Sequence, residues 1–293
     1  MRKIHWSKKM QTKRPDWLRV KLPGGEKYNR LKDILRTANL RTVCEEAVCP
    51  NIGECFGQGV ATFLILGDIC TRECNFCAVG KGKPAVPDEE EPEKIARAVE
   101  QIGLRHVVIT SVTRDDLPDD GANHYAKTIK TIRTHNPTCT IEILIPDFKG
   151  SKNALEIVLD ENPNILNHNL ETVPRLYPDV RPGADYERSL NLLEMAKEIN
   201  PELTTKSGLI LGMGEEFDEI IDVMKDLRAA GCDILTIGQY LSPGKEFIPI
   251  KRFYHPDEFK RLRYEGEKMG FKHVESGPLV RSSYHAAEQF KLF

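Results

Sequence analysis

The stretch GDICTRECNFCAVG, residues 67–80, holds three of the eight cysteines in the chain, and three others lie just upstream in CEEAVCPNIGEC, residues 44–55. The two triplets are Cys44, Cys49 and Cys55, spaced C-x4-C-x5-C, and Cys70, Cys74 and Cys77, spaced C-x3-C-x2-C. Six thiols so close together in sequence indicate disulfides, zinc or an iron–sulfur cluster, and the rest of the sequence helps to choose among these.

The composition disfavours disulfides. The chain has 293 residues, of which 40% are hydrophobic, and this is enough to bury a large core without covalent crosslinks. The N-terminus, MRKIHWSKKMQTKRPDWLRV, is basic but has no apolar run of the secretory type, and no stretch is long and apolar enough to span a bilayer. We therefore expect a cytoplasmic protein with no membrane association, in which clustered cysteines bind a metal or do chemistry.

The spacing also disfavours structural zinc, which takes four ligands that usually come as two C-x2-C pairs. Each triplet instead leaves one coordination position to be filled from elsewhere, and no paired histidine lies nearby. An iron–sulfur cube tolerates this, because three thiolates can bind three irons while the fourth iron takes another ligand. The two remaining cysteines, Cys139 and Cys232, have apolar neighbours and are predicted to be buried core residues.

The motif CTRECNFC, with Phe76 just before its last cysteine, resembles the cluster loop of the radical S-adenosylmethionine (SAM) enzymes. In that family three cysteines bind a [4Fe–4S] cluster, the open iron takes the amino and carboxylate groups of SAM, and one electron releases a 5′-deoxyadenosyl radical. The upstream CEEAVCPNIGEC resembles the auxiliary-cluster motif of the lipoyl synthase family. The likeness extends from RPDWLRVKLP (14–23) to RSSYHA (281–286), through TSVTRDDLPDDGA (110–122), NHNLETV (167–173), YPDVRPGADY (177–186), KSGLILGMGE (206–215) and GQYLSP (238–243).

This resemblance implies an enzyme with SAM and two [4Fe–4S] clusters that inserts sulfur at C6 and C8 of a protein-bound octanoyl group. Cys70, Cys74 and Cys77 would bind the radical cluster, and the other triplet would bind a second cluster that is dismantled to supply the sulfur. The implied partners are an octanoylated lipoyl carrier domain or the glycine cleavage H protein, and a ferredoxin or flavodoxin as reductant. C6 and C8 have no activating group, so acid–base chemistry alone could not modify them.

The pattern of apolar runs predicts the fold without this likeness. After Gly59, strand, turn and helix repeat about every 30 residues, which is typical of a parallel sheet. The predicted strands are 62–67, 106–112, 140–145, 165–170, 204–211 and 233–238. Six such units are too few for an eight-stranded barrel, so we expect an α/β partial (β/α)6 TIM-like barrel over residues 61–245. Residues 1–60 would hold a basic arm and the auxiliary-cluster motif, and residues 246–293 would close the barrel and supply a serine ligand.

Polar side chains gather near the predicted C-terminal strand ends, where such barrels place their sites. The resemblance implies that Asn169 and Arg181 bind the SAM carboxylate, Glu171 the ribose, and the 110–111 segment the amino group. An arginine suits a carboxylate because its guanidinium donates two parallel hydrogen bonds. Each of these residues could instead be a polar core residue satisfied by loop backbone. The candidate cofactor-binding residues are Phe76, Thr110, Ser111, Asn169, Glu171, Arg181, Lys206 and Gln239.

The fourth ligand of the N-terminal triplet is predicted in GPLVRSSYHA, near the C-terminus. Ser282 and Ser283 lie beside Arg281, whose charge favours a serine alkoxide. Adjacent residues of an extended segment face opposite ways, so only one serine should reach the iron. The resemblance implies Ser283, the serine next to the tyrosine. The alternative is a serine pair that caps the C-terminal segment.

Charge is distributed unevenly along the chain. The formal net charge is −2, which argues against a nucleic-acid-binding protein, yet residues 1–30 contain ten Lys or Arg and only two acids. With Trp6 and Trp17 as anchors, this basic arm is expected to lie over the barrel mouth and steer an acidic carrier protein, unless it is a solvated tail. Two other functions stay open: another radical SAM sulfur-inserting enzyme, such as a biotin synthase or a methylthiotransferase, and a two-cluster electron carrier with no SAM pocket.

Overall fold

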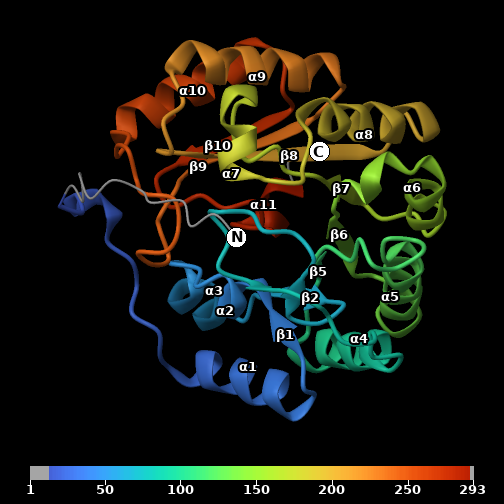
Figure 1. The fold of residues 1–293 in the computed structure, drawn as a ribbon. Coiled ribbons are helices and arrows are strands. Elements are labelled where there is room, and N and C mark those ends of the chain that lie inside the picture. The colour runs from blue at the N-terminus through green and yellow to red at the C-terminus, as the bar shows by residue number, and fades with distance from the viewer. Residues whose placement is uncertain (1–12, 291–293) are drawn as a thin grey trace.

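A computed structural model describes residues 13–290, which form an eight-stranded sheet in the order β1-β2-β5-β6-β7-β8-β9-β10 (Figure 1). All six predicted strands are confirmed and pair in parallel with their neighbours. They are β2 (Thr62–Ile65), β5 (His106–Ser111), β6 (Thr140–Leu144), β7 (Ile165–Asn167), β8 (Thr204–Leu211) and β9 (Ile234–Gln239). The chain is therefore an α/β protein with an open, barrel-like parallel sheet, as predicted.

The sheet also has two strands that the sequence pattern did not predict. β10 (His273–Gly277) adds a further parallel strand beside β9, and β1 (Arg41–Thr42) pairs antiparallel with β2 at the other edge. The C-terminal extension is thus part of the sheet as well as a continuation beyond it. No strand of residues 13–290 joins β1 to β10, so the barrel stays open between these two edges.

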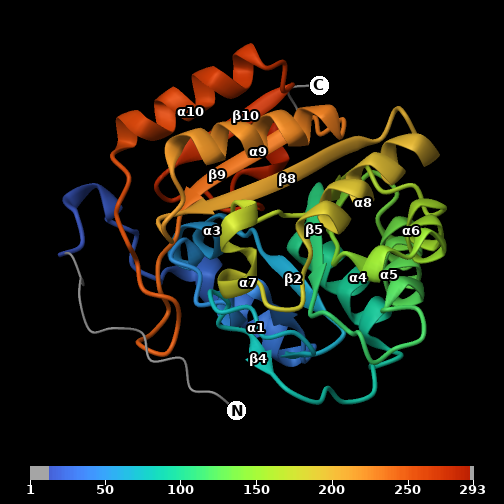
Figure 2. The same ribbon diagram turned by 45° about the horizontal axis from the view of Figure 1, so that its top comes forward.

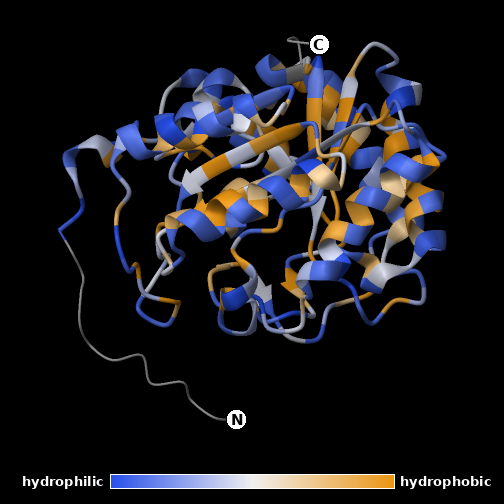
Figure 3. Cartoon of the chain, turned by 90° about the horizontal axis from the view of Figure 1, so that it is seen from above, coloured by the Kyte–Doolittle hydropathy of each residue, from blue (hydrophilic) through white to orange (hydrophobic). Residues whose placement is uncertain are grey.

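Helices cover the outer side of the sheet, and the strands and inner helix faces carry most of the hydrophobic residues (Figures 1 and 3). The helices are α1 (Glu26–Thr37), α2 (Val43–Glu46), α3 (Ile52–Gln58), α4 (Glu91–Ile102), α5 (Ala122–His135), α6 (Lys152–Leu159), α7 (Tyr177–Val180), α8 (Tyr186–Ile199), α9 (Phe217–Ala229), α10 (Pro256–Lys268) and α11 (Ala286–Phe290). Among the described residues, none of these helices is long and apolar enough to cross a membrane.

Local sequence explains where the longer helices begin and end. The side chains of Ser151 and Asp185 accept hydrogen bonds from the first-turn amides of α6 and α8, which satisfies donors that a helix cannot pair internally. α4 ends at Gly103, whose φ of 79° is readily adopted only by glycine. The inward face of α9 is buried as its apolar spacing predicts, at Ile220, Val223, Met224 and Leu227.

The loop with the second cysteine triplet lies at the C-terminal end of β2. Two short strands, β3 (Ile69–Cys70) and β4 (Gly80–Lys81), pair with one another and bracket this loop. Because the strands around it are parallel, the loops that follow them meet at the same end of the barrel. This end is where the candidate site lies. Cys139 and Cys232 are buried away from the loop, with exposed fractions of 4% and 0%, as predicted.

Candidate functional site

A cavity of about 340 Å³ opens at the C-terminal ends of the strands and contacts both cysteine triplets. Segments that are far apart in sequence meet here: the two triplet segments, the loops after β5, β6, β7 and β9, residues 208–210 of β8, and the chain after β10. The cavity is lined by thirteen of the residues singled out from the sequence, which are Cys44, Cys49, Cys70, Cys74, Phe76, Cys77, Thr110, Ser111, Asn169, Glu171, Arg181, Ser282 and Ser283. Cys55, Lys206 and Gln239 are absent from the lining.

Arg72 fixes the second triplet in place from inside the loop. Its guanidinium bonds to Asp115 at 2.8 Å and to Asp147 at 2.5 Å, so the loop is tied to the ends of two other strands. Although burial opposes the charge on Arg72, these two carboxylates raise its pKa above the ordinary value. The thiol of Cys70 accepts hydrogen bonds from the amides of Arg72 at 3.4 Å and Thr113 at 3.3 Å. The loop is therefore ordered by the chain itself.

Two thiols of the second triplet, those of Cys74 and Cys77, have pKa values above the ordinary one. Burial raises the pKa of Cys77 to about 12, and the charges of Cys74 and Cys70 add to this. Burial also raises the pKa of Cys74, against the opposing charge of Arg181. Such thiols stay protonated at neutral pH unless a cation replaces the protons, and this is how a metal cluster binds.

The first triplet is spread over two short helices and the turn between them. Cys44 lies in α2, which begins at the Thr42 side-chain cap, Cys55 lies in α3, and Cys49 lies between the two helices. Burial raises the pKa of Cys44 and of Cys55 to about 12, and for both the charge of Cys49 acts in the same direction. Burial raises the pKa of Cys49 too, and the positive charge of Arg281 opposes it.

Neither triplet resembles a site for a single ion. Within residues 13–290, no three His, Cys, Asp or Glu side chains are placed to hold one metal ion together. In an iron–sulfur cube each thiolate binds a different iron, so its ligands stand farther apart than those around one ion. All eight cysteines are free thiols, in agreement with the expectation that the triplets do not form disulfides.

Asn169, Glu171 and Arg181 form one connected group on the cavity wall. Asn169 Nδ2 donates to Glu171 Oε1 at 3.0 Å, and Arg181 Nη1 donates to the Asn169 carbonyl at 2.9 Å. Burial raises the pKa of Glu171, against the opposing charge of Arg181 and the hydrogen bond from Asn169. Glu171 has a φ of 68°, which is uncommon for a residue other than glycine and is most frequent at functional sites.

Several polar atoms of the cavity wall are buried without a hydrogen-bond partner in the described part of the chain, namely Ser111 Oγ, Asn169 Oδ1, Arg181 Nε and His168 Nε2. Unpaired buried polar atoms are costly, so a native structure that keeps several of them in one cavity is prepared for a polar ligand. Gly208 keeps the wall open beside them, because a Cβ there would lie 2.8 Å from Asn169 Oδ1. The residues present therefore fit SAM, which offers an amino group, a carboxylate and ribose hydroxyls.

Two of the residues predicted to bind SAM lie elsewhere. Lys206 lies near the start of β8 and is fully buried, with Nζ 3.0 Å from Glu142 Oε1, so its charge is already paired inside the barrel. Gln239 Nε2 donates to the carbonyls of Leu211 and Tyr240 at 2.8 and 3.1 Å, which holds the end of β9 in place. The structure thus gives both residues partners within the protein and does not bring them to the cavity.

His168 also lines the cavity and was not predicted from the sequence. It is 2% exposed, its Nδ1 lies 2.9 Å from the Ile145 carbonyl, and burial lowers its pKa to about 4. The imidazole is therefore neutral at physiological pH, with Nδ1 donating to the carbonyl, and its Nε2 faces the site as an acceptor. The sequence could have indicated this residue, because it lies just before Asn169 at the predicted C-terminal end of a strand.

The two adjacent serines differ in their contacts. Ser282 Oγ lies 2.6 Å from Asn169 Nδ2, which donates to it, whereas the Ser283 hydroxyl has no hydrogen-bond partner within residues 13–290. Arg281, next to them, donates to the Val280 carbonyl at 2.6 Å and lies close enough to Cys49 to affect its pKa. The chain after β10 therefore lies between the first triplet and the SAM candidates.

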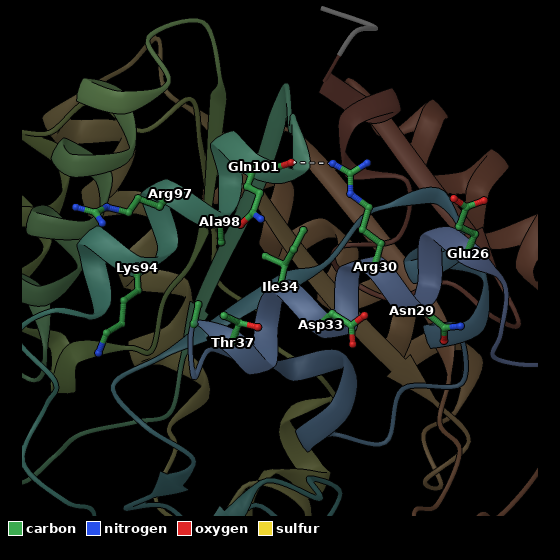
Figure 4. A pocket seen from close by; sticks show the side chains of 11 residues that line it. Glu26, Asn29, Arg30, Asp33, Ile34, Thr37, Lys94, Arg97, Ala98 and Gln101 are labelled. Atoms are coloured by element: carbon green, nitrogen blue, oxygen red, sulfur yellow. Dashed lines mark hydrogen bonds between the residues drawn. The ribbon is translucent and has the colours of Figure 1, made fainter.

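A larger hollow, of about 770 Å³, lies on the outer surface between α1 and α4 (Figure 4). Arg30 reaches across it to the Gln101 carbonyl at 3.5 Å, and charges of both signs surround it. It contains no cysteine and none of the candidate residues. The chemistry of the chain is therefore concentrated in the smaller cavity.

Comparisons with known proteins agree with this site. A model described as the radical SAM superfamily matches residues 64–238, and one described as the N-terminal domain of lipoyl synthase of the radical SAM family matches residues 2–49. The chain is 56% identical over 276 residues to the lipoyl synthase of Rubrobacter xylanophilus, covering 94% of this chain and 86% of that protein. It is 58% identical over 278 residues to that of Acidithiobacillus ferrooxidans, covering 94% and 88%.

Solved structures share the fold at low sequence identity. Methylornithine synthase matches with a TM-score of 0.54 at 16% identity, covering 85% of this chain and 71% of that one. Streptococcus suis SuiB bound to S-adenosylmethionine matches with a TM-score of 0.54 at 15% identity, covering 73% and 49%. These likenesses support the partial-barrel architecture, and the family follows from the relatives of high identity over nearly the whole chain: the protein belongs to the lipoyl synthase family of the radical SAM enzymes.

Proposed function

We propose that the cavity between the two triplets is the active site of a lipoyl synthase reaction on a carrier-bound octanoyl group. Members of this family use SAM and [4Fe–4S] clusters to insert two sulfur atoms, at C6 and C8. The observation that carries the proposal is that cysteines of both triplets, five of the six, line one cavity together with unpartnered polar side chains. A two-cluster electron carrier would need no such cavity.

The chain's own residues would divide the work as follows. Cys70, Cys74 and Cys77 would hold the radical cluster, which with SAM supplies the radical chemistry able to remove hydrogen from a saturated carbon. Phe76 would pack beside them. Cys44, Cys49, Cys55 and Ser283 would hold the second cluster, the source of sulfur.

The polar group on the opposite wall would bind and orient SAM. Arg181, with its free Nε, would donate to the SAM carboxylate, and Asn169 would do so only if its Nδ2 gave up a bond to Glu171 or Ser282. Glu171 would accept from the ribose hydroxyls, and Ser111 Oγ, beside Thr110, would accept from the amino group. Thr110 already donates to the Leu144 carbonyl at 3.1 Å, so of this pair Ser111 has the free hydroxyl. This assignment would pair Arg181 Nε and Ser111 Oγ, and it leaves Asn169 Oδ1 and His168 Nε2 as acceptors for other donors.

The carrier would approach across a basic rim, which we define as Arg14, Lys21, Lys81, Lys245 and Lys251. All five are exposed, and Lys81 itself lines the cavity. We propose as partners an octanoylated lipoyl carrier domain or the glycine cleavage H protein, with a ferredoxin or flavodoxin as reductant. The free thiols suit a reducing compartment such as the cytoplasm.

The N-terminal arm contributes Arg14 and Lys21 to this proposed rim. The rings of Trp17 and His255 meet edge to face at a centroid distance of 5.0 Å, so the arm packs against the segment before α10 (Figures 1 and 2). Trp6 lies outside the described residues. Positive charge near the cavity would attract an acidic carrier and speed its encounter.

One experiment tests the reaction. The reconstituted, reduced protein is incubated with SAM and an octanoylated carrier domain, and the carrier is analysed by mass spectrometry. We expect a carrier that has gained two sulfur atoms. SAM cleavage with an unchanged carrier mass would contradict the proposal and favour another radical SAM activity.

A further inference from the structure

The chain after β10 is fastened to the segment that carries the first cysteine triplet. Asn51 Nδ2 donates a 2.6 Å hydrogen bond to the Leu279 carbonyl, across 228 positions of sequence. Asn51 is only 3% exposed and lies between Cys49 and Cys55. This contact joins the two segments just before the serine pair.

A second contact joins them just after the serine pair. The Tyr284 hydroxyl lies 3.3 and 3.4 Å from the two oxygens of the Glu54 carboxylate and donates to them. His285 Nε2 lies 3.6 Å from the same carboxylate, and the rings of Tyr284 and His285 stack with centroids 4.0 Å apart. Glu54 directly precedes Cys55, so both contacts are made by residues that lie within the span of the first triplet.

The fastened segment is also ordered from within. The Tyr284 amide donates to the Arg281 carbonyl at 2.9 Å, which closes a turn around the two serines, and Gln289 Nε2 donates to the Tyr284 carbonyl at 2.8 Å. His285 has a φ of 54°, a left-handed conformation that costs free energy in a residue other than glycine. Such a conformation persists only where surrounding contacts hold it.

We propose that Asn51 and Glu54 are positioning residues whose two contacts, one on each side of the serine pair, hold Ser283 at the N-terminal cysteine triplet. This rests on the proposed role of Ser283 as a ligand. Because both contacts lie within the span from Cys49 to Cys55, the serine and the thiols move as one unit. Loss of either contact frees the serine segment on one side, while the loop around Cys70 keeps its own anchors at Asp115 and Asp147.

The test compares variants that remove one contact at a time. Asn51→Ala removes the donor to the Leu279 carbonyl and should speed exchange at the start of the segment, and wild-type exchange there would overturn the role of Asn51. The other variants act on the contact at Glu54. Tyr284→Phe removes only the hydroxyl and keeps the ring, Glu54→Ala removes the acceptor, and Glu54→Gln retains an oxygen that can accept. Tyr264→Phe is the matched control, because this tyrosine lies on α10 and is 58% exposed. Glu267→Ala is the control for the carboxylate, since it lies on the same outer helix and its partner is Arg263.

Two quantities are measured on each variant. Hydrogen exchange of the amides of residues 279–290 is followed by mass spectrometry before and after cluster reconstitution, and iron release from reconstituted protein to a ferrous chelator is timed. We expect exchange about tenfold faster in Tyr284→Phe and Glu54→Ala, because a hydrogen bond to a charged group is lost. Glu54→Gln should be milder, and the controls should match the wild type.

Iron release should be faster in the same two variants, with an unchanged rate of SAM cleavage. Combining Tyr284→Phe with Glu54→Ala should give exchange no faster than Glu54→Ala alone, since Tyr284 and Glu54 share one contact. Wild-type exchange and iron release in both variants would overturn the proposal, and so would a parallel loss of SAM cleavage. If the proposed function itself were wrong, the wild-type protein would make no lipoyl product, while the exchange comparison would still report the contact.

Discussion

Asn169 Nδ2 donates a 2.6 Å hydrogen bond to Ser282 Oγ, although the two residues lie 113 positions apart in sequence. Asn169 also donates to Glu171, so one amide group joins the candidate SAM wall to the chain after β10. The hydrogen bond from Asn169 engages the hydroxyl of Ser282. The hydroxyl of Ser283 has no partner among residues 13–290. The contact therefore favours Ser283 as the ligand of the first triplet.

The two serines should respond differently to substitution. Ser283→Ala is expected to leave SAM cleavage intact, to change the absorption and Mössbauer spectra of the auxiliary cluster and to abolish lipoyl formation. Ser282→Ala should keep those spectra and weaken SAM binding about fivefold, because Asn169 loses one hydrogen bond. The reverse ranking would assign the ligand to Ser282, and two silent variants would refute a serine ligand.

Substitutions in the two cysteine triplets should affect different steps of the reaction. Cys74→Ala is expected to abolish SAM cleavage, because the proposed radical cluster would lose one of its three thiolate ligands. Cys49→Ala should retain SAM cleavage and lose sulfur insertion, with about half the iron of the wild type after reconstitution. The measurements are 5′-deoxyadenosine release, carrier mass and bound iron. Lipoyl product from Cys49→Ala would show that the auxiliary cluster is not the sulfur donor.

The buried pair of Lys206 and Glu142 should affect stability, and SAM binding should not depend on it. Lys206→Met leaves an uncompensated carboxylate in the barrel, which costs about 3–5 kcal/mol in the free energy of unfolding. Replacing both residues, as in Lys206→Met with Glu142→Leu, should cost less, since no charge is left unpaired. SAM affinity is measured at a temperature where both variants are folded. A large loss of SAM affinity in the double variant would return Lys206 to the binding site.

Barrels of this kind place their sites at the C-terminal ends of the strands. This explains which site residues could be predicted from the sequence and which predictions failed. Asn169 and Glu171 follow β7 and reach the cavity, whereas Lys206 lies near the start of β8, where its Nζ is paired with Glu142 inside the barrel. Strand β8 itself was predicted with its observed bounds, Thr204–Leu211. β10 was missed since HVESG, residues 273–277, is short and polar, and its pairing with β9 depends on tertiary packing.

Contacts between segments more than 200 residues apart could not be predicted from local pattern. The resemblance implied that the first triplet meets the C-terminal chain at a serine, but nothing in the sequence indicates that Asn51 and Glu54 make the contacts. The thiols were predictable because their chemistry requires a fixed spacing. Hydrogen bonds such as these depend on the completed fold, so they become visible only in the structure.

His168 should make stability depend on pH. Its pKa is about 4 in the folded protein, against 6.5 ordinarily, so the unfolded chain takes up a proton first as the pH falls. The contribution of His168 to the free energy of unfolding is therefore fully present above pH 6.5. It falls by about 3 kcal/mol as the pH is lowered from 6.5 to 4. The free energy of unfolding, measured by chemical denaturation between pH 7.5 and 4.5, should fall more steeply with falling pH in the wild type than in His168→Gln. Equal slopes would show that the imidazole is not held neutral.

The basic arm should act through charge. Deleting residues 1–20 is expected to weaken carrier binding about tenfold at low ionic strength and to flatten its salt dependence, because exposed charges are screened beyond about 8 Å at physiological salt. Arg14→Glu with Lys21→Glu should reproduce most of the effect while the Trp17 contact with His255 remains. The matched control is Lys225→Glu with Lys260→Glu, since these exposed lysines lie on the outer helices α9 and α10. The measurement is the association rate with an octanoylated carrier domain across a salt series. Wild-type affinity and salt dependence after the deletion would show that the arm is a solvated tail. A loss of association rate in the control variant as large as in Arg14→Glu with Lys21→Glu would show that the net charge of the protein matters, and not the position of these residues.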